Sequence, residues 1–186
     1  SWWGAAVLLS AAGAWLTGVV AERRLVLVGS RPAPALVGSA AVNNAGTGHA
    51  AKSGPNYTPM QPNGRVAADK AVAINAAFER SLEFWGSLLE RGRLTSTGFL
   101  HRAAHISAVW TPANIAFLRQ RFEQLKDIPA FAEMRWTEDR QDLSEWMPLV
   151  MEGRDPNQAV AATRIERGTD VDFGALTRAY LLPLQS

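Results

Sequence analysis

The sequence contains no cysteine and only three histidines among its 186 residues. The absence of cysteine excludes a disulfide framework, a thiolate zinc site, an iron–sulfur cluster and a cysteine nucleophile. The histidines, His49, His101 and His105, do not have the HExxH spacing of a helical zinc site. A metal site built by this chain would have to depend on carboxylates, and we do not expect one.

A strong excess of charge of either sign is also missing. The 19 Lys and Arg residues are nearly balanced by 17 Asp and Glu residues, which gives a formal net charge of +2. The basic residues are interleaved with acidic ones, whereas a nucleic-acid surface needs them gathered in a patch or stripe. Nucleic acid is therefore not an expected partner. The length is sufficient for one ordinary hydrophobic core with an appendage.

Charged residues are absent from the first 21 positions, SWWGAAVLLSAAGAWLTGVVA. A run of this length is about as long as a helix that crosses a bilayer. The Trp2–Trp3 pair and the Arg23–Arg24 pair that follows suit the two membrane interfaces. Residues 1–24 are thus a candidate membrane anchor, with residues 1–21 in contact with lipid. A buried helix of a soluble fold explains the same run, and both interpretations stay open.

A degenerate dinucleotide-binding turn is a third interpretation of this segment, because Leu25–Val28 (LVLV) resembles a short buried strand after the helix. Such a turn needs glycines where the backbone approaches a pyrophosphate, and an acid after the second strand to bind the ribose. Gly4 is the one glycine of the best candidate turn, and Gly29 occupies the position of the acid. We do not expect this segment alone to form a phosphate site.

The rest of the chain predicts a mixed α+β protein. Residues 25–65 contain the short strand and then an irregular arm rich in proline and glycine, and residues 66–186 form a body of helices and strands. Apolar periodicity and capping residues predict helices over residues 67–91, 112–126, 137–146 and 172–182, and strands over residues 104–110 and 159–164. Thr111 before Pro112 is a typical helix start.

One short run in the arm, NNAGTGHAA at residues 43–51, is rich in residues with special uses. Two glycines around a threonine can expose consecutive backbone N–H groups as an anion-binding nest, with a histidine beside it. A tight turn capped by asparagine side chains is the simpler interpretation. The candidate ligand-binding residues of this run are Asn43, Asn44, Gly46, Thr47, Gly48 and His49.

Several motifs together resemble the malate:quinone oxidoreductase family. They are NNAGTGHAA followed by NYTP at residues 56–59, HISAVW at 105–110, EWMPLVMEGRDP at 145–156 and VAATRIERGTDVDFGALTR at 160–178. Motifs of this length are far more specific than an isolated glycine turn. The resemblance implies a remnant of an FAD-binding Rossmann-like fold at the membrane surface, and a family activity that oxidises malate to oxaloacetate and passes two electrons through FAD to quinone.

The resemblance also assigns roles to particular residues. Gly4 lies on the glycine turn of the family, and residues 43–49 lie on the loop that faces the flavin. His105, together with Arg164 or Arg167, is the candidate for binding the malate carboxylates or transferring a proton. The chain departs from the family pattern around the glycine turn and beside residues 43–49, and members of the family continue far beyond the equivalent of Ser186.

Two hypotheses follow from this combination of retained and lost features. In the first, the chain is a non-catalytic structural subunit of a membrane electron-transport complex, anchored by its apolar start and bound to other subunits, without FAD. In the second, it is part of an active FAD-dependent malate:quinone oxidoreductase whose fold is completed by another chain or by a region outside this sequence. The departures at the glycine turn favour the first hypothesis, and the intact motifs towards Ser186 favour the second. Of the two, we prefer the first.

Overall fold

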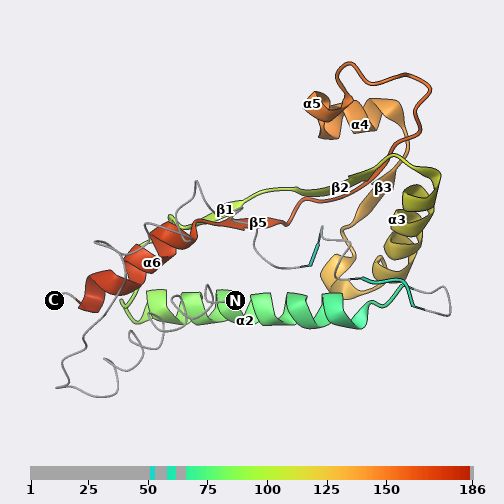
Figure 1. Ribbon diagram of the computed structural model, residues 1–186. Helices are drawn as coiled ribbons and strands as arrows, with labels where there is room; N and C mark the ends of the chain where they lie inside the picture. Colours follow the sequence, from blue (N-terminus) through green and yellow to red (C-terminus); the bar gives the residue numbers. More distant parts are fainter. Residues whose placement is uncertain (1–50, 53–57, 62–65, 185–186) are drawn as a thin grey trace, which may run out of the picture. The chain divides into compact units, whose positions relative to one another are not determined.

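The computed structural model describes residues 51–52, 58–61 and 66–184, which form a mixed α/β protein as expected (Figure 1). Its elements in chain order are α2 (Asp69–Glu90), β1 (Leu100–Arg102), β2 (His105–Val109), α3 (Pro112–Leu125), η3 (Pro129–Phe131), β3 (Arg135–Thr137), α4 (Arg140–Trp146), α5 (Pro148–Met151), β4 (Ala161–Ile165), β5 (Thr169–Val171), α6 (Phe173–Leu181) and η4 (Leu182–Leu184). They belong to two compact units: the first comprises the described residues of 49–79 and 102–169, and the second comprises those of 80–101 and 170–184.

The first unit is built on a three-stranded antiparallel sheet with the order β2-β4-β3. In the register, His105 lies opposite Ile165, and Ile106 lies opposite Arg164. Directly opposed residues share a face and successive residues alternate between faces. One face of the sheet therefore carries His105 and Ile165, and the other carries Ile106 and Arg164.

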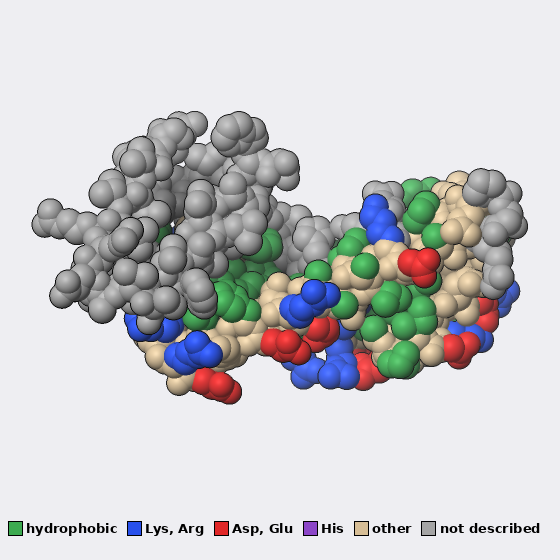
Figure 2. Space-filling view, turned by 90° about the horizontal axis from the view of Figure 1, so that it is seen from below, with side chains coloured by type: hydrophobic (Ala, Val, Ile, Leu, Met, Phe, Trp, Pro, Cys, Tyr) green, Lys and Arg blue, Asp and Glu red, His purple; other side chains and the backbone are tan. Residues whose placement is uncertain are grey.

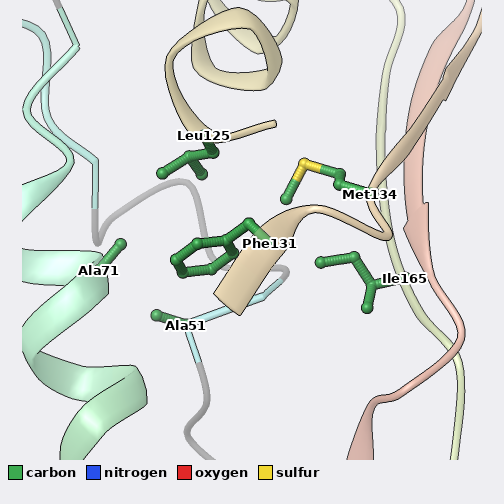
Figure 3. Packing of buried hydrophobic residues seen from close by; sticks show 6 residues of the cluster. All are labelled: Ala51, Ala71, Leu125, Phe131, Met134 and Ile165. Atoms are coloured by element: carbon green, nitrogen blue, oxygen red, sulfur yellow. The ribbon is translucent and has the colours of Figure 1, made fainter. Parts of the chain in front are cut away.

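Each face of this sheet has its own hydrophobic cluster. On the Ile165 face, the cluster contains Ala51 of the arm, Ala71 of α2, Leu125 of α3, Phe131 of η3, Met134 just before β3, and Ile165 of β4 (Figure 3). On the Ala162 face, α4, α5 and the start of β4 contribute Leu143, Met147, Met151, Val160 and Ala162. The sheet is thus covered on both faces, which explains why all but one residue of β4 are buried.

Helix α3 begins as the sequence predicts. Thr111 is the N-cap residue, its hydroxyl oxygen accepts a hydrogen bond from the Asn114 amide at 3.3 Å, and Pro112 fills the first helical position. Leu118 and Leu125 are buried on the face towards the sheet. Arg121 is buried with them, at the position between the two leucines where an apolar residue is expected.

The second unit packs aromatic side chains from α2 and α6. The indole Nε1 of Trp85 donates a hydrogen bond to the phenol oxygen of Tyr180 at 2.5 Å, and both side chains are buried. The ring of Phe99 meets that of Trp85 edge to face, with 5.3 Å between the centroids. Asp172 caps α6 by accepting a hydrogen bond from the Ala175 amide, as the sequence predicts.

Charges of both signs lie among apolar side chains on the face shown in Figure 2. The apolar segment 1–24, with the glycine at position 4, and most of the irregular arm lie outside the described residues. The membrane anchor expected at residues 1–24 therefore stays a prediction. Within the ranges that are described, no helix is long and apolar enough to cross a membrane. The sheet of the first unit is antiparallel, whereas a Rossmann-like unit is built on parallel strands.

Candidate functional site

The candidate site begins where the NNAGTGHAA run ends. Residues 43–50, which include all six candidate ligand-binding residues of the run, lie outside the described part of the chain. Ala51, the last residue of the run, and Lys52 are described, and we call these two residues the loop exit. Ala51 is 2% exposed and has a φ of 56°, in the left-handed region that residues with a Cβ rarely occupy. Ala51 is therefore buried and conformationally strained, whereas Lys52 is partly exposed.

Arg121 holds the loop exit from helix α3. Its Nη2 donates to the carbonyl oxygens of Ala51 at 3.0 Å and Lys52 at 3.3 Å. Its Nε donates to the hydroxyl oxygen of Thr58 at 3.0 Å. Thr58 belongs to the NYTP motif and is fully buried. One guanidinium group thus joins the end of the NNAGTGHAA run to the NYTP motif and to α3.

Lys52 connects the loop exit to the turn between β4 and β5. Its Nζ donates a hydrogen bond to the carbonyl oxygen of Arg167 at 2.7 Å. Burial lowers the pKa of Lys52, the positive charge of Arg167 lowers it further, and the nearby carboxylates of Glu79 and Glu133 raise it. The Arg167 side chain points elsewhere, since its Nη1 pairs with Glu133 at 3.1 Å on the surface.

His105 lies at the same turn. Its Nε2 accepts a hydrogen bond from the backbone amide of Thr169 at 3.3 Å, and the imidazole is 8% exposed. A neutral imidazole that accepts at Nε2 carries its proton on Nδ1. The main chain of Ala103 adds a second connection, because its amide donates to the Gly168 carbonyl oxygen at 3.2 Å. The backbone of Arg167 thus contacts the loop exit directly. The ring of His105 contacts Thr169, two residues further along the same turn.

Arg164 lies apart from His105, on the opposite face of the sheet. Its guanidinium lies over the ring of Trp146, with Cζ 5.7 Å from the ring centroid, and the guanidinium of Arg135 lies over the same ring at 5.1 Å. Both arginines pair with Glu166, at 2.8 Å for Arg164 Nε and 2.7 Å for Arg135 Nη2. The structure therefore does not bring His105 and Arg164 together, and their roles towards malate stay predictions.

The residues that the sequence did not single out are Arg121 and Lys52. The helical spacing offers a signal for Arg121, since it follows Leu118 by three residues and precedes Leu125 by four, which places it on the apolar face of α3. Lys52 offers none, because a lysine in a loop rich in proline and glycine is usually exposed. The described residues contain no cluster of acids and histidines able to hold a metal ion.

Comparison with known proteins agrees with the motifs. A family model described as malate:quinone oxidoreductase matches residues 2–186. The chain is 83% identical over 183 residues to a probable malate:quinone oxidoreductase of Synechococcus sp. strain CC9902, covering 98% of this chain and 36% of that protein. It is 57% identical over 183 residues to a probable malate:quinone oxidoreductase of Prochlorococcus marinus strain MIT 9303, with 98% of this chain and 37% of that protein covered.

The chain therefore belongs to the malate:quinone oxidoreductase family, and it spans little more than a third of the length of the curated relatives it matches. The aligned region of the Synechococcus protein covers nearly the whole chain. The comparisons give no evidence for a non-catalytic subunit. The hypothesis of an active enzyme accounts better for the match.

Proposed function

We propose that this chain forms part of an FAD-dependent malate:quinone oxidoreductase, which oxidises malate to oxaloacetate and reduces a quinone. The observation that carries the proposal is the family match over residues 2–186. The contacts at the loop exit support it, because they connect the NNAGTGHAA run to the turn that carries Arg167 and to His105. The proposed reaction is balanced: malate loses two electrons and two protons, and the quinone gains both as it becomes a quinol.

FAD would supply the two-electron carrier between malate and quinone. Residues 43–49 would hold it, and the described neighbours of this run fit such a ligand in one respect. The guanidinium of the buried Arg121 donates a hydrogen bond to the carbonyl oxygen of Ala51 and so places a positive charge at the end of this run. That charge favours a ligand with negative charge through its electrostatic field, without direct contact.

We propose that the described residues hold the loop exit and orient the turn at residues 167–169. Arg167 contributes its backbone to the loop exit and a surface guanidinium that already pairs with Glu133. His105 accepts a hydrogen bond from the main chain and lies below the surface, so orientation of the turn at residues 167–169 suits it better than proton transfer with substrate. A membrane location is part of the proposal because quinones partition into lipid, and residues 1–21 are the candidate contact.

The experiment that tests the proposal is a flavin and activity measurement on the full-length protein. We expect flavin absorption that is bleached by malate and restored by a soluble quinone analogue, with succinate as the control substrate. Replacement of both Gly46 and Gly48 by valine should remove the flavin, whereas Gly86→Ala on α2 should keep it, because no atom lies within 4 Å of a Cβ at Gly86. A folded wild-type protein without flavin, or one whose flavin malate does not bleach, would refute the proposal.

A further inference from the structure

Among the described residues, Arg121 is the largest side chain that is completely buried, with 0% of its surface exposed. Burial lowers its pKa to about 10. In the described part of the chain its hydrogen bonds go to neutral oxygens of Ala51, Lys52 and Thr58. A buried cation without an ion pair is costly, and a core position on α3 would otherwise favour an apolar residue. Stability alone does not explain an arginine here.

The backbone conformation of the loop exit also costs free energy. Ala51 has a positive φ of 56°, and for a residue with a Cβ the left-handed conformation costs roughly 1–2 kcal/mol. Such strain persists only where the surroundings fix it, and it concentrates at functional sites. Two interactions fix Ala51. Its methyl group packs in the cluster with Phe131 and Ile165 (Figure 3), and its carbonyl oxygen accepts a hydrogen bond from Arg121.

We propose that Arg121 is a positioning residue: it fixes the backbone of the loop exit and thereby supports flavin binding by the NNAGTGHAA run. This inference rests on the proposed function for the identity of the ligand. The contacts that carry it are those of Arg121 with Ala51, Lys52 and Thr58, all of which lie among the described residues. Arg121 touches neither substrate nor flavin in this proposal and acts through the loop.

The shape of the guanidinium explains why arginine occupies this position. One planar group directs Nε to Thr58 and Nη2 to the two carbonyl oxygens of the loop exit. Lysine would bring a single nitrogen on a flexible stem and could not hold three acceptors in a fixed arrangement. We therefore expect Arg121→Lys to retain the fold but to restore only part of the positioning.

The test compares Arg121→Met and Arg121→Lys with Arg119→Met in the full-length protein. Arg119 lies on the same helix, but its side chain is 61% exposed and it contacts Glu138 and Trp136, so Arg119→Met controls for the loss of a charge on α3. The first readout is hydrogen exchange of a peptide that covers residues 51–61. The second is the dissociation constant of FAD together with the visible circular dichroism of the bound flavin, which reports on its surroundings.

In Arg121→Met we expect exchange of the 51–61 peptide to accelerate about tenfold or more, because a hydrogen bond to a charged group is lost. The dissociation constant of FAD should rise about tenfold as the competent loop conformation is depleted, and the circular dichroism of the remaining flavin should change. Arg121→Lys should be intermediate, and Arg119→Met should match the wild type. If Arg121→Met does not fold, Arg121→Lys decides, since it keeps the charge.

Two results would count against different claims. Equal exchange of the 51–61 peptide in wild type and Arg121→Lys, with unchanged flavin circular dichroism, would overturn the positioning role and leave the proposed function intact. A wild-type protein that neither holds flavin nor responds to malate would refute the proposed function, and the exchange measurement alone would then decide whether Arg121 fixes the loop exit.

Discussion

The imidazole of His105 lies directly against the backbone of Gly168, at the turn between β4 and β5. A Cβ at Gly168 would overlap with the imidazole Cδ2 and the carbonyl oxygen of Ala103, and would lie 2.7 Å from the imidazole Cγ. The neighbouring amide of Thr169 donates to the same imidazole. The turn that carries Arg167 is therefore closed around His105 and admits no side chain at position 168.

Gly168→Ala should destabilise the fold by at least about 2 kcal/mol, because the added methyl group meets a backbone oxygen and a buried ring that cannot both move away. The free energy of unfolding from denaturant titration measures the effect. Gly86→Ala is the matched control, since it adds the same methyl group within α2 where no atom lies within 4 Å. It should be neutral or stabilising by up to about 1 kcal/mol. Equal effects of the two substitutions would contradict the steric argument.

His105→Phe and His105→Gln should differ in a way that separates packing from hydrogen bonding. Phenylalanine fills the space but leaves the Thr169 amide without its acceptor, which should cost about 1–2 kcal/mol in unfolding free energy. Glutamine offers a carbonyl oxygen and should lose less. If His105 instead transfers a proton in the reaction, both variants should lose kcat to a similar extent while their stabilities differ, and the pH profile of kcat should lose one of its limbs.

The helices were predictable because each combines apolar periodicity with a recognisable start. Residues 67–91 and 112–126 are observed as α2 and α3 with ends within two residues of the prediction, and Thr111 and Asp172 are the N-caps. The strands at residues 104–110 and 159–164 are confirmed as β2 and β4. The short strand β3 was missed, because its three residues have no pattern of their own and are strand only through their pairing with β4.

The site was less predictable than the fold. Resemblance identified the motifs, but the contact between Lys52 and Arg167 joins residues 115 positions apart, and no local pattern encodes such a pairing. The separation of His105 from Arg164 depends on their positions in the β2–β4 register, which sequence alternation alone does not give. The spacing of Arg121 from Leu118 and Leu125 indicates the apolar face of α3, but no local pattern encodes its hydrogen bonds to Ala51, Lys52 and Thr58.

Tyr180→Phe should change how stability depends on pH in alkaline solution. Burial raises the pKa of Tyr180 from 10.0 to about 12, despite the opposing effect of its hydrogen bond from Trp85. Because the folded pKa is the higher one, the neutral phenol contributes stability that is fully present below pH 10.0 and is lost as the pH rises towards 12. The loss is on the order of 2 kcal/mol. Across this pH window, the free energy of unfolding of Tyr180→Phe should therefore change less with pH than that of the wild type.

The measurement for Tyr180 can be made specific because the chain has only two tyrosines, Tyr57 and Tyr180. In a Tyr57→Phe background, phenolate absorbance reports Tyr180 alone. We expect ionisation to coincide with the loss of tertiary structure. Ionisation near pH 10 in a protein that is still folded would show that the phenol is accessible to water and would contradict the burial seen here.

Glu166→Gln should make the stability of the protein depend less on pH in acidic solution. The hydrogen bond from Arg164 lowers the pKa of Glu166 below 4.5, and Arg135 adds to the effect. A carboxyl whose folded pKa is lowered contributes stability above its unfolded pKa and loses it as the pH falls through the folded value. The difference in melting temperature between wild type and Glu166→Gln should therefore be largest near neutral pH and vanish in strong acid. Glu152→Gln, at an exposed acid with no ion pair among the described residues, should show no such trend, and a parallel trend in both would assign the effect to net charge.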